Sequence, residues 1–135
     1  MYCILHETNI HSKFSLLEKF TLVISCIGHD LDHPGFNNAY QINASTDLAI
    51  IYNDISPLEN HHAAVLFAML RHSSLDVCRG LTESESREFR RDSVSCILAT
   101  DMARHGDILN RFKAICDSFK FEDETHRKLV WLYLI

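Results

Sequence analysis

Side chains that can bind a metal ion or move a proton fill residues 29 to 33, which read His-Asp-Leu-Asp-His. The cluster directly follows an apolar run that extends from Leu22 to Ile27. Imidazole and carboxylate groups are common ligands of divalent metals in proteins. The sequence therefore predicts a metal site at the end of an apolar helix, at the edge of a pocket that is largely dry.

Two neighbouring residues, His29 and Asp30, are the candidate ligands. They cannot both reach one metal from a regular helix, because adjacent helical side chains point about 100° apart. Gly28 before the pair and Pro34-Gly35 after it favour a break in the helix that removes this restriction. A carboxylate can bridge two metals whereas an imidazole binds one, so Asp30 is the candidate bridge and His29 a terminal ligand.

The cluster has two simpler interpretations. His29 and His33 have the spacing of the metalloprotease motif HExxH, but Asp30 replaces its glutamate and Pro34 stops the helix. A polar turn that merely caps a helix is the simplest alternative. Four candidate ligands within five residues favour a metal site instead, in which Asp32 and His33 hold the ligands in orientation.

The rest of the sequence predicts helices and no strands, and hence a compact all-α unit. Capping boxes open three of these helices, at Ser15–Glu18, at Ser56–Glu59 and at Thr82–Glu85. We expect the third helix to continue through Met102, a further helix over residues 107–119 and short helices over 37–53. The final segment, residues 129–135, is apolar on every side, which predicts a helix whose burial all round needs neighbours that this chain does not supply.

Composition excludes several classes of protein. With 135 residues, of which 47% are hydrophobic, the chain can form one domain with a core. A net charge of −5 without a basic tract does not favour nucleic-acid binding. No apolar stretch approaches the roughly 20 residues that span a bilayer. Five cysteines without a CxxC pair indicate reduced thiols, as in a cytoplasmic protein.

Three longer strings together resemble a known family. Residues 29–38 read HDLDHPGFNN, residues 52–62 read YNDISPLENHH and residues 98–105 read LATDMARH. These strings resemble the catalytic domain of class I 3′,5′-cyclic-nucleotide phosphodiesterases, and are most similar to the high-affinity cGMP-specific type 9 branch. The resemblance implies an all-α bundle that hydrolyses a cyclic nucleotide, with cGMP favoured over cAMP. The chain would form the middle portion of a larger helical metallohydrolase catalytic domain.

The resemblance also implies a set of site residues and cofactors. Zn²⁺ would occupy the tighter of two metal sites and Mg²⁺ or Mn²⁺ the looser one. Asp30 and Glu59 would serve catalysis, His29 and Asp30 would bind metal, and Glu59 would hydrogen-bond water in the metal shell. The remaining candidates surround the metals or face the pocket: Asp32, His33, Asn38 and His62 near the metals, and Thr100, Asp101 and Met102 in the pocket.

Parts of the family's pattern are not found in this sequence. Neither an HNxxHAxDV box before His29 nor a DxSN box after residue 135 is present. We therefore expect residues 1–135 to be a partial catalytic domain, truncated at both ends and inactive alone, from a protein that could form a homodimer. Two alternatives stay open: an inactive product that acts only by association with full-length subunits, and a different HD-type phosphohydrolase, which the second and third strings argue against.

Overall fold

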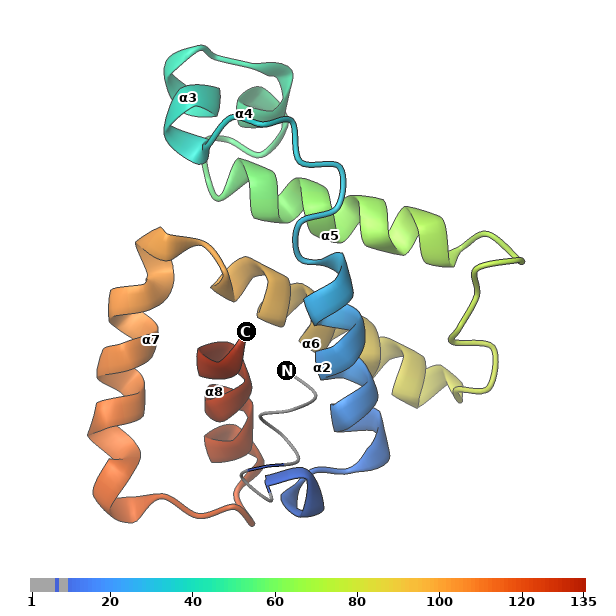
Figure 1. Ribbon diagram of the computed structural model, residues 1–135, viewed down its shortest axis with the longest axis vertical. Coiled ribbons are helices and arrows are strands. Elements are labelled where there is room, and N and C mark those ends of the chain that lie inside the picture. The colour runs from blue at the N-terminus through green and yellow to red at the C-terminus, as the bar shows by residue number, and fades with distance from the viewer. Residues whose placement is uncertain (1–6, 8–9) are drawn as a thin grey trace.

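The structure is a computed structural model that describes Glu7 and residues 10–135, and this part of the chain is helical and contains no strand (Figure 1). The predicted all-α fold is confirmed. No helix in these residues is both long enough and apolar enough to cross a membrane. The elements in chain order are η1 (Ile10–Lys13), α2 (Leu16–Gly28), α3 (Asn38–Asn43), α4 (Asp47–Ile51), α5 (Pro57–Leu70), α6 (Glu83–Ala99), α7 (Met102–Ile115), η2 (Cys116–Ser118) and α8 (Glu124–Leu134).

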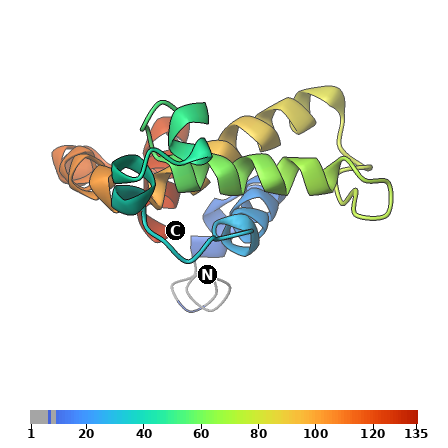
Figure 2. The same cartoon turned by 90° about the horizontal axis from the view of Figure 1, so that it is seen from above.

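Helix α6 is the central element of the fold. It packs against α2, α5, α7 and α8, so segments from most of the chain meet along it. The short helices α3 and α4 form a lobe at the N-terminal end of α5, and α7 and α8 lie side by side at the other edge (Figures 1 and 2). The segment between α2 and α3 contains the candidate ligand residues 29–33 and runs past the first turns of α5.

Two of the three predicted capping boxes are confirmed. The Ser15 Oγ accepts from the Glu18 backbone N–H at 3.1 Å, and the Glu18 carboxylate accepts from the Ser15 backbone N–H at 2.6 Å. Thr82 and Glu85 make the same reciprocal pair at the start of α6. Such pairs satisfy backbone donors that have no partner inside the helix, so the local sequence suffices to place these two helix starts.

Two predictions about helix boundaries are wrong. Ser56 does not cap α5, because its backbone is left-handed with a φ of 43° and its side chain makes no capping hydrogen bond. The third predicted helix does not continue through Met102, because α6 ends at Ala99 and Asp101 caps a new helix that begins at Met102. In both places a side chain has a partner far away in the sequence, and this overrides the local signal.

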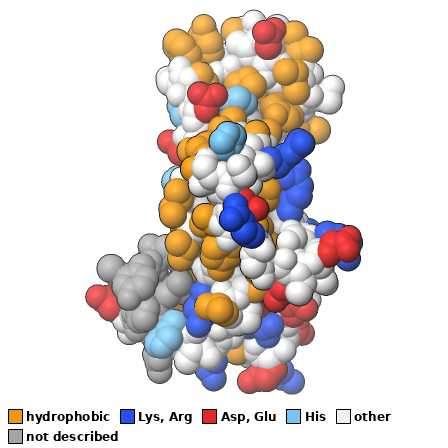
Figure 3. Space-filling view, turned by 90° about the vertical axis from the view of Figure 1, so that its right-hand side faces the viewer, with side chains coloured by type: hydrophobic (Ala, Val, Ile, Leu, Met, Phe, Trp, Pro, Cys, Tyr) orange, Lys and Arg blue, Asp and Glu red, His pale blue; other side chains and the backbone are white. Residues whose placement is uncertain are grey.

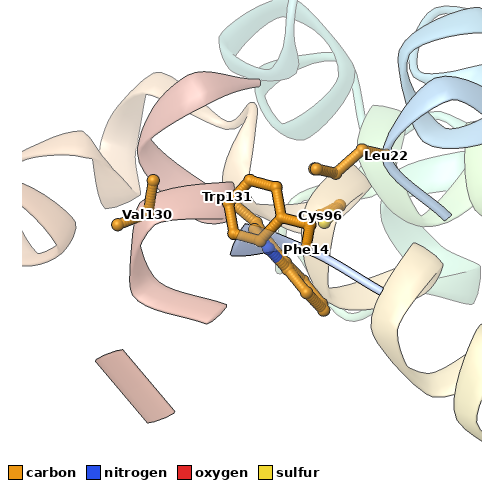
Figure 4. Packing of buried hydrophobic residues seen from close by; sticks show 5 residues of the cluster. All are labelled: Phe14, Leu22, Cys96, Val130 and Trp131. Carbon is orange, nitrogen blue, oxygen red and sulfur yellow. The ribbon is translucent and has the colours of Figure 1, made fainter. Parts of the chain in front are cut away.

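The main core joins α2, α6 and α8. Its buried members are Phe14, Leu22, Cys96, Val130 and Trp131, and the Trp131 indole lies beside the Phe14 ring (Figure 4). Burial raises the pKa of the Cys96 thiol to about 12, which makes this cysteine unreactive at neutral pH. Cys26, Cys78 and Cys116 are also free thiols.

Helix α8 is buried on part of its surface. Leu129, Val130 and Trp131 are buried, whereas Tyr133 is 48% exposed, which agrees with the expectation that the residues of this chain do not cover the helix on every side. Polar contacts complete its docking: the Arg127 guanidinium lies 3.0 Å from the Glu18 carboxylate on α2. The exposed side of α8 is directed at the pocket described next, and its apolar residues form one wall of that pocket.

Candidate metal centre and pocket

A pocket of about 450 Å³ opens where four parts of the fold meet. They are the loop after α2, the first half of α5, the junction between α6 and α7, and the end of α8. Polar groups come from the first two parts and apolar groups mainly from the others. The lining residues are His29, Asp30, His33, Leu58, Glu59, His62, Ala99, Thr100, Met102, His105, Leu132, Tyr133 and Ile135.

The loop that carries the candidate ligand residues 29–33 is held against α5 by two consecutive histidines. The His61 Nε2 lies 2.8 Å from Oδ2 of Asp32. The His62 Nδ1 lies 2.6 Å from the carbonyl oxygen of Leu31. Asp32 has a left-handed backbone with a φ of 58°, which turns the loop at the second of these anchored residues. This geometry is the helix break that the sequence predicts after Gly28.

Nitrogen or oxygen atoms of three side chains come close together beside this loop. The ligand atoms of Asp30, His33 and His62 all lie within 4.8 Å of one another. Because a carbonyl oxygen can only accept a hydrogen bond, the His62 Nδ1 must donate to Leu31. In the neutral ring this leaves a lone pair on Nε2, which faces Oδ1 of Asp30 at 3.6 Å. Two electron-pair donors facing each other at this distance fit a divalent cation between them.

The same hydrogen-bond argument separates the roles of His29 and His33. The His29 Nδ1 donates to the carbonyl of Cys26 at 2.9 Å, so its Nε2 is left as a possible ligand atom. The His33 Nδ1 accepts from the Gly35 backbone N–H at 3.0 Å, so a neutral ring carries its proton on Nε2 and can donate a hydrogen bond there. His29 therefore has a ring nitrogen available for a metal, although it lies outside the group formed by Asp30, His33 and His62. The neutral His33 ring can instead donate a hydrogen bond to water through Nε2.

Glu59 brings a second carboxylate to the pocket from the first turn of α5. Its Oε2 accepts from the side-chain amide of Asn38 at 2.8 Å. The Asn38 Oδ1 in turn accepts from the Leu58 backbone N–H at 3.0 Å. Asn38 itself is not part of the pocket lining, and it contacts the pocket through two residues that are, Leu58 and Glu59.

The α6–α7 junction places its three predicted pocket residues differently. Thr100 and Met102 line the pocket, and the Thr100 hydroxyl donates to the Ile97 carbonyl at 2.7 Å. Asp101 lies outside the lining and joins two elements instead. Its Oδ1 caps α7 through the Ala103 N–H, and its Oδ2 accepts from the Ser56 hydroxyl at 2.6 Å.

The sequence did not lead us to predict two residues of the pocket lining, His105 and Tyr133. Their rings stack with centroids 6.4 Å apart, across the gap between α7 and α8. His105 follows Met102 by three positions and therefore shares its helix face, a signal that was available in the sequence. No local pattern distinguishes Tyr133 from its apolar neighbours in α8.

Substitution of Gly28 by alanine is expected to displace the candidate ligand residues that follow it. A Cβ at this position would lie 2.8 Å from Cδ2 of the buried Leu66. We expect a loss of about 1–3 kcal/mol in the free energy of unfolding, as for other overpacked contacts, together with weaker Mn²⁺ binding. Chemical denaturation and Mn²⁺ titration measure the two effects. Gly106→Ala is the matched control, because a Cβ there meets no atom within 4 Å; equal losses in the two variants would contradict the prediction.

Comparison with known proteins agrees with this geometry. The 3′5′-cyclic nucleotide phosphodiesterase family matches residues 1–135. The high-affinity cGMP-specific 3′,5′-cyclic phosphodiesterase 9A of Drosophila melanogaster is 46% identical over 135 residues, which are 100% of this chain and 9% of the relative. For the Homo sapiens protein of the same name, the identity is 43% and the share of the relative is 23%.

A solved structure extends the likeness to three dimensions. The phosphodiesterase domain of the RhoPDE fusion protein from Salpingoeca rosetta superposes with a TM-score of 0.84 at 34% identity. The match covers 88% of this chain and 39% of the solved one. The chain therefore spans a minor part of the proteins that it matches. By the match over its whole length, it belongs to the 3′5′-cyclic nucleotide phosphodiesterase family.

Proposed function

We propose that the protein hydrolyses a 3′,5′-cyclic nucleotide, with cGMP as the preferred substrate, to the 5′-monophosphate. The observation that supports this proposal is the group of side chains that could hold a metal ion, beside a pocket with an apolar wall, in a chain of this family. The chain spans 9% and 23% of the two relatives named above, so the proposal concerns the activity of the protein as a whole.

The proposed metal ligands are His29 and Asp30, with Zn²⁺ at the tighter site and Mg²⁺ or Mn²⁺ at the looser one. Support comes from the hydrogen bond that leaves the His29 Nε2 free and from the position of Asp30 opposite His62. Bound divalent metals would neutralise phosphate charge and activate the attacking water. We assign His33 and Glu59 to orienting that water, since His33 offers a donor and Glu59 an acceptor at the same pocket.

The apolar side of the pocket is the proposed place for the nucleotide base. Leu58, Met102, Leu132 and Tyr133 supply aliphatic and aromatic surface opposite the charged groups. A cyclic nucleotide has the same division into an anionic phosphate and a flat base, and pockets of this mixed character suit such ligands. The proposed preference for cGMP is supported by two relatives that are 43–46% identical to this chain and are named cGMP-specific phosphodiesterases.

The test is an assay of the purified protein, in the longest form that cells make, with cGMP and cAMP as substrates. The protein is first stripped with a chelator and then reloaded with Zn²⁺ and either Mg²⁺ or Mn²⁺. We expect hydrolysis of cGMP that disappears on stripping, returns on reloading and has a KM below that for cAMP. A metal-loaded, folded protein that hydrolyses neither nucleotide would overturn the proposal, and a lower KM for cAMP would overturn the cGMP preference alone.

A further inference from the structure

Helix α5 starts without a cap from its own residues. The first backbone N–H groups of a helix have no partner inside the helix, and a side chain at the residue before it usually supplies one. Ser56 holds that position, but its hydroxyl donates to Asp101 instead. The Glu59 carboxylate would normally fold back to the Ser56 N–H in a capping box, yet it is bonded elsewhere.

The missing cap comes from Asn38, which is twenty positions earlier in the chain. Its Oδ1 accepts from the Leu58 N–H at 3.0 Å, which is the hydrogen bond that a capping serine would otherwise accept. Its Nδ2 donates to Oε2 of Glu59 at 2.8 Å, which draws the carboxylate away from the start of its own helix. A primary amide has an acceptor and donors on one planar group, so one asparagine performs both tasks.

The position of Asn38 is set by the short helix that contains it. Asn38 is the first residue of α3, and the neighbouring Asn37 caps that helix through a hydrogen bond of 2.9 Å from the Tyr40 N–H to its Oδ1. Helix α3 also packs against α4 and α5. The Asn38 amide is therefore presented from a rigid element, as a group that orients a functional side chain should be.

We propose that Asn38 is a positioning residue, which caps α5 from another helix and thereby holds Glu59 in the pocket with its second carboxylate oxygen free for metal-bound water. This inference rests on the proposed function, because it assigns Glu59 a task at the metals. Its consequence is specific: without Asn38, Glu59 can return to the local capping position at Ser56 and withdraw from the metal site.

The first arm of the test measures the hydrogen bonds themselves by NMR of the ¹⁵N-labelled protein. In Asn38→Ala we expect the amide hydrogen of Leu58 to exchange roughly tenfold faster, because its acceptor is removed. Thr82→Ala is the matched control, since it removes a side-chain cap from a different helix, α6, without touching Asn38, Leu58 or Glu59. Unchanged exchange at Leu58 in Asn38→Ala would overturn the inference, whatever the metal does.

The second arm measures Mn²⁺ affinity in a double-mutant cycle of Asn38→Ala and Glu59→Ala. If Asn38 acts through Glu59, Asn38→Ala weakens Mn²⁺ binding roughly tenfold in the native background, as for other groups that orient ligands, and has no further effect once Glu59 is alanine. Thr82→Ala should leave the affinity unchanged. An equal loss in Asn38→Ala and Thr82→Ala, or a full loss in the Glu59→Ala background, would overturn the inference.

The two arms separate this inference from the proposed function. A folded protein that binds no Mn²⁺ and hydrolyses no cyclic nucleotide would overturn the proposed function and, with it, the task assigned to Glu59. Metal binding that depends on Asp30 but not on Asn38 would keep the proposed function and overturn the inference.

Discussion

Replacement of Asp30 by asparagine is expected to reduce cyclic-nucleotide hydrolysis by at least about 100-fold and to remove most of the bound metal. The change removes the negative charge of Asp30. The nitrogen or oxygen atoms of Asp30, His33 and His62 that could bind a metal all lie within 4.8 Å of one another. Asparagine has nearly the same shape, so the loop should keep its backbone path. Elemental analysis of the dialysed protein and a cGMP hydrolysis assay measure the two losses.

The matched control for Asp30→Asn is Asp54→Asn. Asp54 is also an exposed aspartate, in the turn between α4 and α5, but it lies outside the pocket lining. We expect metal content and turnover within about twofold of the unmodified protein, since surface substitutions away from special features have small effects. An Asp30→Asn protein with full metal content and full turnover would show that the assigned metal centre is wrong.

The second large effect is expected from Trp131→Ala, which should lower the free energy of unfolding by about 3–5 kcal/mol. Trp131 is only 2% exposed and packs with its ring centroid 6.1 Å from that of Phe14, in an edge-to-face arrangement. It belongs to the core that joins α2, α6 and α8. Because domains of this size are stable by only about 5–15 kcal/mol, this loss is a large fraction of the total stability. Urea denaturation followed by circular dichroism measures the loss.

Trp131→Phe is the control that separates ring packing from loss of a polar group. The Trp131 Nε1 is buried and has no hydrogen-bond partner among the described residues, so phenylalanine removes no hydrogen bond there. We expect less than half the loss seen in Trp131→Ala, because most of the apolar contact is kept. Equal losses in the two variants would mean that the indole ring does not stabilise the core through its contact area.

The exposed apolar groups of the α3–α4 lobe are a separate feature of the surface. Phe36 and Tyr40 are about half exposed and stack on each other with ring centroids 4.2 Å apart. Ile50, Ile51 and Ile55 are 64–70% exposed in the same part of the chain. In the space-filling view, hydrophobic side chains accordingly gather at the end of the molecule formed by this lobe (Figure 3).

Much of this protein is encoded in short stretches of its sequence. The starts of α2 and α6 follow from capping boxes that close within four residues, and the loop after α2 follows from Gly28 and the Pro34-Gly35 pair. These features were predictable because each hydrogen bond or backbone restriction that causes them lies inside the segment that shows the pattern. The spacing of the predicted ligands, with His29 and Asp30 side by side at a helix end, is local in the same way.

Only the tertiary structure decided how the site is assembled. Ser56 has the sequence pattern of a helix cap, but its hydroxyl donates a hydrogen bond to Asp101, which is 45 residues later in the chain. Asn38 caps α5 from 20 residues away, and His62 holds the metal loop through a carbonyl 31 residues earlier. The apolar wall comes from α8, which is docked by Arg127 against Glu18 across 109 residues. Local patterns cannot anticipate such contacts, because a polar side chain bonds whichever partner the packing of distant helices brings within about 3 Å.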